Sequence, residues 1–257
     1  MRLTGFDGQS AFVTGAAGGI GRAVVDELLA AGAQVMATDT DAALALMQGQ
    51  PGGAVWRALD VRDHARAADL VVEAASLHGP LSLGVHAAGI LSVQPVLDIT
   101  ADEWQRVADI NTGGTLNMLQ AFGRAMRGQG RGAIVVIGSN AGGVPRLGIG
   151  AYGASKAGAA MLTRAAGLEL APLGIRCNLV APGSTLTPMQ TGMWADPQAG
   201  AAAVIAGDAA QFRTGIPLGK LATPQDIAQA AMFLLSDQAG HVTMADLYVD
   251  GGATLRA

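Results

Sequence analysis

Short apolar runs alternate along the chain with longer stretches in which apolar residues recur at helical spacing. The apolar runs lie near residues 10–14, 33–38, 54–58, 82–86, 132–138, 174–180 and 245–249. Runs of this length are typical of strands, and the stretches between them are typical of amphipathic helices. Strands that alternate with helices form parallel sheets, because each helix carries the chain back to the start of the next strand. The pattern predicts an α/β protein with one doubly wound, parallel, seven-stranded sheet and helices on both faces.

One predicted helix contains a break near its middle. Thr100 and Glu103 form a capping box, and apolar residues over positions 104–122 continue the helical spacing for about six turns. The centre of this helix reads Asn111-Thr112-Gly113-Gly114. Each glycine costs a helix interior roughly 1 kcal/mol relative to alanine. The glycines therefore predict a kink or a close approach, with Asn111 as the polar residue inside it.

A glycine-rich turn joins the first strand to a helix. Residues 10–14 form the strand pattern, Gly15-Ala16-Ala17-Gly18-Gly19-Ile20-Gly21 is the turn, and residues 22–29 have the helical pattern. Glycines let such a turn close tightly, and its N–H groups act with the helix dipole to stabilise a pyrophosphate. The spacing is G-x-x-x-G-x-G rather than G-x-G-x-x-G. In this strand, turn and helix setting, the glycines predict a Rossmann-like dinucleotide site.

Asp39 follows the second strand and lies eighteen residues beyond Gly21. A carboxylate at this place accepts hydrogen bonds from the adenosine ribose hydroxyls and repels a 2′-phosphate. No arginine or lysine lies between positions 38 and 42 to bind that phosphate. We therefore expect NAD rather than NADP as the cofactor. The alternative is that Asp39 only caps the helix that follows it.

Tyr152 and Lys156 lie four residues apart in a predicted helix, and Tyr152 comes thirteen residues after Ser139. Side chains at this spacing share one helix face. An ammonium beside a phenol favours the phenolate, so we expect the pKa of Tyr152 to fall from about 10 and the phenol to act as a general base. Ser139 is in a position to hold the reacting oxygen. The alternative is a surface Tyr and Lys on an alanine-rich helix.

Composition limits the class of protein. The 257 residues carry a formal net charge of −4, and 50% of them are hydrophobic, which suits one large domain or two small ones. Because no stretch has the composition of a linker, we expect a single domain over residues 1–257. No Lys/Arg cluster would neutralise phosphates, and no apolar stretch has the length of a membrane helix, so neither nucleic acid nor a membrane is an expected partner.

Two further features of composition concern cellular location. Cys177 is the only cysteine, so no intramolecular disulfide is possible, and its apolar setting predicts a buried strand position. The start of the chain lacks the charged and then apolar pattern of a signal peptide. We therefore expect a cytoplasmic protein.

Taken together, these residues resemble the short-chain dehydrogenase/reductase family over nearly the whole chain, from Gly15 to Gly252. The resemblance depends on an ordered series of motifs: the glycine turn, Asp39, Asp60-Val61, Ala87-Ala88-Gly89, Asn111, Ser139, Tyr152, Lys156 and Pro182-Gly183. One departure is His86-Ala87-Ala88-Gly89, where the family usually has Asn-Asn-Ala-Gly. That departure puts a local polar contact in doubt.

The resemblance implies roles for these residues. Catalysis would depend on Asn111, Ser139, Tyr152 and Lys156, with Asn111 binding a water that links Lys156 to solvent. NAD would be bound by Gly15, Ala17, Gly19, Ile20, Gly21, Asp39, Asp60, Val61, Ala87, Ala88, Gly89, Tyr152, Lys156, Pro182, Gly183, Thr185 and Thr187. Asp60 would lie beside the adenine amino group, unless it caps the helix beginning near Asp63. The family also implies a homotetramer or a homodimer.

The distal half of the chain resembles family members that act on a cyclic acid. Its motifs include residues 145–148, 182–185 and 215–220. The resemblance implies NAD-dependent oxidation of a ring secondary hydroxyl in a cyclohexadiene diol acid, which gives the catechol acid of catecholate siderophore biosynthesis. Another cyclic substrate, such as 2,3-dihydro-3-hydroxyanthranilate, or another secondary alcohol remains an alternative. So does a dinucleotide sensor without turnover.

Candidate substrate residues lie in two segments. Arg146 could hold the ring carboxylate in a bidentate geometry, with Gly148, Met189 and Gln190 also at the substrate. The segment from about 185 to 214 has weak periodicity and is expected to form a substrate lid. The alternatives are a solvated Arg146 and a Met189 that packs against the core.

Two rival chemistries find little support. The histidines at positions 64, 78, 86 and 241 show no metal-ligand spacing, so no metal is expected. Gly138-Ser139-Asn140 is not the G-x-S-x-G turn of a hydrolase, so Ser139 is not expected to be a nucleophile.

Overall fold

The computed structural model describes residues 2–47, 49 and 52–255. Within them, seven parallel strands form one sheet in the order β3-β2-β1-β4-β5-β6-β7. The strands are β1 (Ser10–Thr14), β2 (Gln34–Asp39), β3 (Ala54–Ala58), β4 (Leu81–His86), β5 (Gly132–Ile137), β6 (Ile175–Pro182) and β7 (Asp246–Val249). The predicted seven-stranded parallel sheet is confirmed. Residues 1, 48, 50, 51, 256 and 257 of the expected domain lie outside the described residues.

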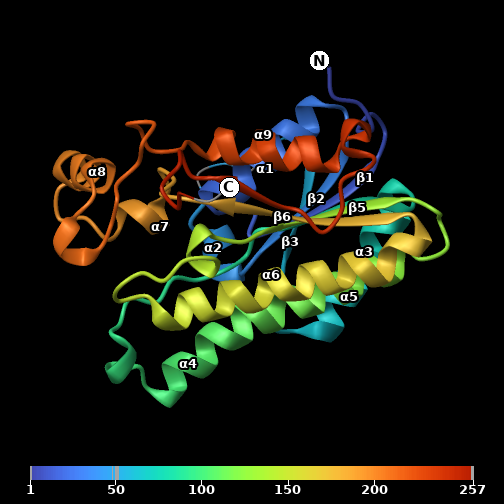
Figure 1. The fold of residues 1–257 in the computed structure, drawn as a ribbon. Helices are drawn as coiled ribbons and strands as arrows, with labels where there is room; N and C mark the ends of the chain where they lie inside the picture. The colour runs from blue at the N-terminus through green and yellow to red at the C-terminus, as the bar shows by residue number, and fades with distance from the viewer. Residues whose placement is uncertain (1, 48, 50–51, 256–257) are drawn as a thin grey trace.

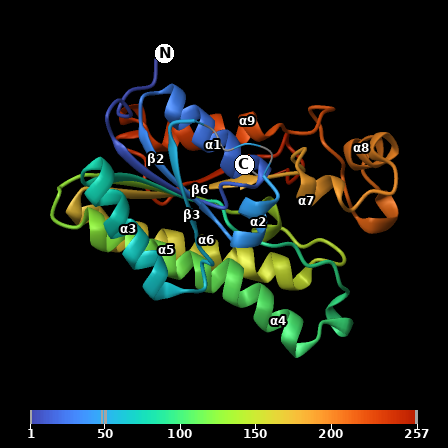
Figure 2. The same ribbon diagram turned by 180° about the vertical axis from the view of Figure 1, so that it is seen from behind.

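Helices cover both faces of the sheet (Figure 1). On one face α1 (Gly19–Ala30) packs against α9 (Pro224–Leu235). On the other face lie α3 (His64–His78), α5 (Gly114–Met126) and α6 (Gly150–Leu170), which Figure 2 shows from behind. The remaining α-helices are α2 (Asp41–Ala45), α4 (Ala101–Ala108), α7 (Pro188–Thr191) and α8 (Pro197–Ala206), and 3₁₀ turns occupy Val96–Asp98, Asn140–Gly142, Ala171–Leu173, Ala209–Gln211 and Asp237–Ala239.

The central strands are buried on both faces, which explains why they read as apolar runs rather than as alternating patterns. In β1, Ala11 and Val13 join the core beneath α1 and α9, whereas Phe12 joins the core beneath α3, α5 and α6. Phe12 packs edge-on against Phe122 of α5, with ring centroids 5.6 Å apart. The sheet is therefore a rigid support whose strand ends hold fixed positions.

The strand order reverses direction between β1 and β4, and ligands of such sheets bind in the crevice at this switch point. The turns that follow these two strands touch. Gly15 has a φ of 64°, and a Cβ at this residue would lie 2.5 Å from the backbone nitrogen of Ala88. Glycine at position 15 therefore allows the close approach of the two turns.

The kink predicted in the long helix is present as a π-helical turn. This turn spans Asp109–Gly113 and joins α4 to α5. Gly114 follows it, and a Cβ there would lie 2.6 Å from the Val61 side chain, so the glycine serves a close approach as well. At the other end, Thr100 caps α4 by accepting from the N–H of Glu103 (3.2 Å), but the Glu103 carboxylate pairs with Arg106. Half of the predicted capping box therefore forms.

Strand β6 is joined to the end of α9 by Arg176. Its guanidinium donates hydrogen bonds to the carbonyl oxygens of Leu234, Leu235 and Ser236, at distances of 2.5, 3.0 and 3.0 Å. These contacts place a cation at the negative end of the helix dipole. Beside it, Cys177 is fully buried, as its setting predicts, and burial raises the pKa of its thiol to about 12.

The segment between β6 and α9 carries α7 and α8 to one side of the sheet (Figure 1). A β-bridge between Thr185 and Ala222 joins the two ends of this segment to each other, and the N–H of Leu218 donates to the carbonyl oxygen of Gly251, beyond β7 (3.1 Å). Within it, Gly200 leaves room on α8 for the ring of Trp194.

Candidate active site

A cavity of about 500 Å³ opens at the carboxyl ends of the strands, within the usual size range of small-molecule sites. Ser139, Tyr152 and Lys156 line it together. Other residues expected at the site line it as well: Ile20, Ala87, Gly89, Arg146, Pro182, Gly183, Thr185, Thr187, Met189 and Gln190. The fold thus gathers, at one edge of the sheet, residues that lie far apart in the sequence.

Gly148, expected at the substrate, is not among the residues that line this cavity. Its φ of 74° places it at the turn between Arg146 and α6, where a left-handed backbone favours glycine. The other expected residues outside the lining belong to the dinucleotide end or lie behind the cavity: Gly15, Ala17, Gly19, Gly21, Asp39, Asp60, Val61, Ala88 and Asn111.

Helix α6 presents Tyr152 and Lys156 one turn apart. Lys156 is only 6% exposed, and its Nζ lies 5.9 Å from the centre of the Tyr152 ring. The same Nζ donates a hydrogen bond to the carbonyl oxygen of Ile137, at the end of β5 (3.0 Å). The alternative of a surface Tyr and Lys pair is therefore wrong.

The electrostatics of the pair differ from the expectation. Burial raises the pKa of Tyr152, and the hydrogen bond with Ser139 acts in the opposite direction. The expected lowering by the ammonium is not found, because desolvation of the phenolate outweighs the favourable contacts. Burial also lowers the pKa of Lys156 to about 8. At neutral pH the phenol is therefore neutral, whereas Lys156 still carries its proton but releases it more readily than a lysine in water.

Ser139 is fixed by the turn that follows β5. Its Oγ accepts a hydrogen bond from the N–H of Ala141 (3.1 Å) and so caps the 3₁₀ turn Asn140–Gly142. In the same turn, the Asn140 side chain donates to Asp250 (3.3 Å), near the carboxyl terminus. This backbone hydrogen bond fixes the position of the serine hydroxyl beside Tyr152.

Asn111 is 1% exposed and joins the kinked helix to two other elements. Its Nδ2 donates to the carbonyl of Ile90 and to Oγ of Ser155, both at 2.9 Å, and its Oδ1 accepts from the N–H of Ile90 (2.8 Å). A Cβ on Gly89 would lie 3.1 Å from both Asn111 Oδ1 and Lys156 Nζ. The asparagine and the lysine therefore both lie close to Gly89.

His86, the first residue of the motif that departs from the family pattern, is 2% exposed at the end of β4. Its Nδ1 shares a hydrogen bond with Thr14 Oγ1 (2.8 Å), so the local polar contact in doubt is present. Nε2 has no hydrogen-bond partner among the described residues. Burial, together with the charge of Lys156, lowers the pKa of His86 to about 3. The imidazole is therefore neutral and buried, not a surface residue.

The glycine turn has the shape that a pyrophosphate needs. Helix α1 begins at Gly19, and its N-cap, Gly18, has no side chain to occupy the first N–H groups of the helix. A Cβ on Gly21 would collide with the backbone of Gly15, and one on Gly19 would lie 2.9 Å from the Thr187 side chain. The uncapped start of α1 and the lack of side chains on this turn therefore fit a dinucleotide pyrophosphate, and Thr187 lies against the same turn.

Asp39 holds this turn against the end of β2. One carboxylate oxygen accepts from the N–H of Ala17 (3.0 Å) and the other from the N–H of Thr40 (2.8 Å). Thr40, not Asp39, caps α2 by accepting from Ala43, so the capping alternative is wrong. Each carboxylate oxygen keeps a lone pair that ribose hydroxyls could use.

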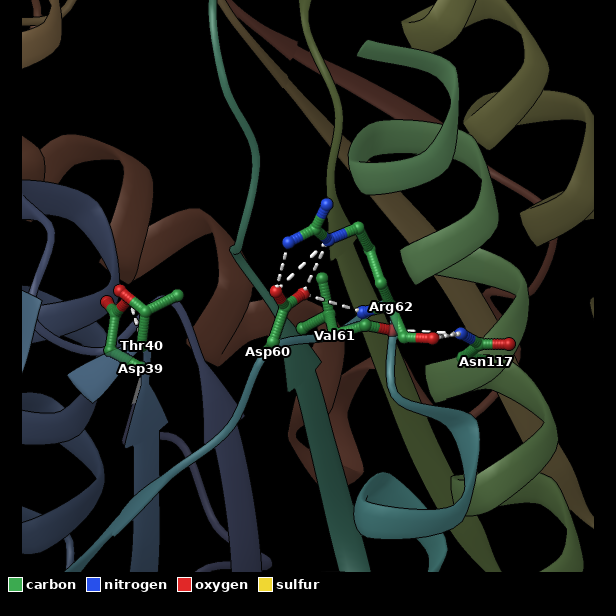
Figure 3. Close-up of polar contacts among 6 residues, drawn as sticks. All are labelled: Asp39, Thr40, Asp60, Val61, Arg62 and Asn117. Carbon is green, nitrogen blue, oxygen red and sulfur yellow. Dashed lines mark hydrogen bonds and ion pairs between the residues drawn. The ribbon is translucent and has the colours of Figure 1, made fainter. Parts of the chain in front are cut away.

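Figure 3 shows the adjacent strand end, where Asp60 faces Arg62. The Arg62 Nε lies 3.0 Å from both carboxylate oxygens, and Nη2 lies 2.5 Å from one of them. This pairing lowers the pKa of Asp60. Asp63 caps α3, so the capping alternative for Asp60 is wrong. Asn117 of α5 fixes the loop by donating to the carbonyl of Val61 (2.9 Å).

On the substrate side, Met189 and Gln190 belong to the short helix α7, which Thr187 caps. Met189 is 47% exposed and lines the cavity, so packing against the core is excluded. Arg146 is half-buried in the cavity wall rather than fully solvated.

Neither a metal centre nor a membrane segment is found in the part of the chain that the structure describes. No group of three or more His, Cys, Asp or Glu residues there could hold a metal ion. Nor is any helix of the described residues both long and apolar enough to cross a bilayer.

A glycine turn at the switch point of a parallel sheet, beside a buried Tyr and Lys pair, defines a dinucleotide-dependent oxidoreductase. A family model described as enoyl-(acyl carrier protein) reductase matches residues 15–254. The vibriobactin-specific 2,3-dihydro-2,3-dihydroxybenzoate dehydrogenase of Vibrio cholerae serotype O1 is 48% identical over 249 residues, which cover 95% of each chain. The 2,3-dihydro-2,3-dihydroxybenzoate dehydrogenase of Bacillus subtilis is 43% identical over 260 residues, covering 99% of each.

Among solved structures, levodione reductase superposes with a TM-score of 0.87 at 28% identity, over 98% of this chain and 100% of that one. The chain belongs to the short-chain dehydrogenase/reductase family.

Sequence reasoning missed several residues of this site, and three of them bear on its chemistry. Arg62 pairs with Asp60, and Arg213 and Trp194 line the cavity. Arg213 had a signal in the sequence, because it is the only arginine or lysine between residues 185 and 214. Arg62 had only its closeness in sequence to Asp60, which does not reveal a contact.

Proposed function

We propose that this protein is an NAD-dependent 2,3-dihydro-2,3-dihydroxybenzoate dehydrogenase, which makes 2,3-dihydroxybenzoate for a catecholate siderophore. One observation supports this above all. The cavity that Ser139, Tyr152 and Lys156 line is also lined by Arg146, so a guanidinium able to bind a carboxylate shares it with the groups that would remove a hydroxyl proton. The identity of 48% to an enzyme named for this reaction supports the same substrate.

In the proposed mechanism, Tyr152 Oη takes the proton from the ring hydroxyl that is oxidised. Ser139 Oγ holds that hydroxyl in place, and Lys156, within reach of the phenol ring, stabilises the phenolate. The proton then leaves by way of Lys156 and a water at Asn111; both residues lie close to Gly89. NAD, when bound, supplies the hydride acceptor. The ketone product tautomerises to an aromatic ring, which makes the reaction favourable in this direction.

NAD would lie along the strand ends from the glycine turn to Tyr152. The N–H groups at the start of α1 would hold its pyrophosphate, and Asp39 would accept from the ribose hydroxyls and disfavour a 2′-phosphate. Asp60 and Val61 would flank the adenine. Thr185 and Thr187 would approach the phosphate and carboxamide side, because Thr187 lies against Gly19.

The substrate would lie between Arg146 and the segment from about 185 to 214, which we propose to be a lid. Arg146 would bind the ring carboxylate, Met189 would cover the ring, and Gln190 would meet a hydroxyl. We further propose a single domain over the chain. It would assemble as a homotetramer through the faces of α5 and α6 and through β7, and act in the cytoplasm, where the NAD pool is available. Light scattering tests the assembly, and a dimer would contradict it.

Replacement of Tyr152 by Phe tests the mechanism. The change removes only the phenol oxygen, so turnover of 2,3-dihydro-2,3-dihydroxybenzoate should fall by at least about a hundredfold. NAD binding should stay within roughly threefold of wild type, because the glycine turn is untouched. Steady-state kinetics and calorimetric titration with NAD measure the two effects. A Tyr152→Phe enzyme with near-native turnover would contradict the proposed role of the tyrosine.

A further inference from the structure

Two arginines from distant parts of the chain line the same cavity. Arg146 lies on the loop between β5 and α6, whereas Arg213 lies in the segment between β6 and α9 that we propose to be a lid. Both side chains are half-buried. The cavity wall therefore carries one cation from the loop between β5 and α6 and one from the segment between β6 and α9.

Within the described residues, neither arginine forms an ion pair with a carboxylate. The carboxylate whose charge acts on Arg146 is Asp250, but its oxygens accept from Asn140 Nδ2, from the N–H of Gly252 and from the N–H of Thr254. Burial lowers the pKa of Arg146, and the charge of Arg213 lowers it further. Two like charges thus face one cavity without a bound counter-charge from the chain.

The backbone around Arg213 is well defined. Asp208 and Arg213 exchange two hydrogen bonds, each 2.9 Å long, and so close a short loop. Phe212 has a left-handed φ of 56°, which is unusual for a bulky residue, and its side chain is 87% exposed. The strained residue turns the chain so that the aromatic ring faces solvent while Arg213 lines the cavity.

We propose that Arg213 is a second anchor for the carboxylate of the substrate, and that it joins Arg146 on that carboxylate when the lid closes. This inference depends on the proposed function, since it concerns the same cavity. An anion placed between two guanidiniums replaces their repulsion with two charge-assisted contacts. A neutral ring leaves the repulsion in place. Binding of an acid therefore closes the lid, whereas binding of an uncharged analogue does not.

The experiment compares 2,3-dihydroxybenzoate with 2,3-dihydroxybenzamide, which has the same shape without the charge. Their dissociation constants are measured by calorimetry on the enzyme with NADH bound, for wild type and Arg213→Gln. In Arg213→Gln, loss of one charge-assisted contact should raise the dissociation constant of the acid by about ten- to a hundredfold. The dissociation constant of the amide should rise by roughly threefold or less. Arg213→Lys keeps the charge and should recover part of the affinity for the acid.

Lys220→Gln is the matched control, because Lys220 is an exposed cation just beyond the lid and does not line the cavity. It should bind both ligands like wild type. Equal weakening of acid and amide in Arg213→Gln would overturn the inference, as would an Arg213→Lys variant that recovers nothing.

Turnover of 2,3-dihydro-2,3-dihydroxybenzoate distinguishes a failure of the Arg213 anchor from a failure of the proposed function. If wild type oxidises the diol acid but Arg213→Gln binds both ligands as wild type does, the second anchor is wrong and the proposed function stands. If wild type prefers the acid through Arg213 but does not oxidise the diol acid, the second anchor stands and the proposed function is wrong.

Discussion

At the scale of single residues, two buried basic side chains, His86 and Lys156, show how burial sets the pKa values at the site. The two side chains are 2% and 6% exposed, and the charge of Lys156 contributes to the low pKa of His86. Burial disfavours the charged form of each base. An asparagine at position 86 would carry no titratable proton, so the histidine adds a pH dependence that the family pattern lacks.

Replacement of His86 by Asn should therefore change acid stability. The pKa of His86 is about 3 in the folded protein, against the ordinary 6.5. Between these values the unfolded chain binds a proton that the folded protein does not, so the free energy of unfolding falls as the pH falls through this window. From pH 7 to pH 4 this loss is roughly 3 kcal/mol for wild type, and His86→Asn should avoid it.

Urea unfolding at both pH values measures the difference, with His64→Asn as the control, because His64 is exposed. That control should lose stability as wild type does. The same acid loss in His86→Asn and wild type would show that His86 titrates normally in the folded protein.

At the scale of elements, the end of α9 depends on a side chain from β6. Arg176→Met leaves the carbonyl oxygens of Leu234, Leu235 and Ser236 without the guanidinium that now binds them. Buried acceptors without partners are costly. We expect the free energy of unfolding to fall by about 2–4 kcal/mol, measured by guanidinium denaturation.

Arg127→Met serves as the control for this change, because Arg127 is an exposed arginine at the end of α5. It should leave the denaturation midpoint unchanged. If Arg176→Met also unfolds at the wild-type midpoint, the guanidinium contributes nothing to the junction of β6 and α9.

The sequence pattern predicts a helix, strand or turn well where residues close together in the sequence determine its conformation. The central strands are buried on both faces, so their apolar runs mark their positions, and the glycines around Asn111 mark the π-helical turn Asp109–Gly113. Pattern did not reveal that Glu103 pairs with Arg106 instead of returning to Thr100. Both the backbone N–H of Thr100 and the side chain of Arg106 are within reach of the Glu103 carboxylate in a helix, so only the folded structure shows which of them it binds.

At the scale of the whole molecule, the sequence predicts which residues gather at the site but not how burial shifts their pKa values. The spacing of Tyr152 and Lys156 places them on one helix face, but their desolvation depends on the parts of the folded chain that pack around them. That is why the expected fall in the pKa of Tyr152 was wrong. Arg213 faces Arg146 only because the chain returns to the cavity after β6, and no local pattern encodes that return.

The central claim is that this cavity oxidises a cyclic diol acid with NAD. The most direct test is to give the purified protein 2,3-dihydro-2,3-dihydroxybenzoate with either NAD or NADP, and to follow the reduced nicotinamide and identify the product. The account predicts stoichiometric 2,3-dihydroxybenzoate with NAD and at least about tenfold lower efficiency with NADP. No reduced nicotinamide with either cofactor, while NAD binds normally, would contradict it.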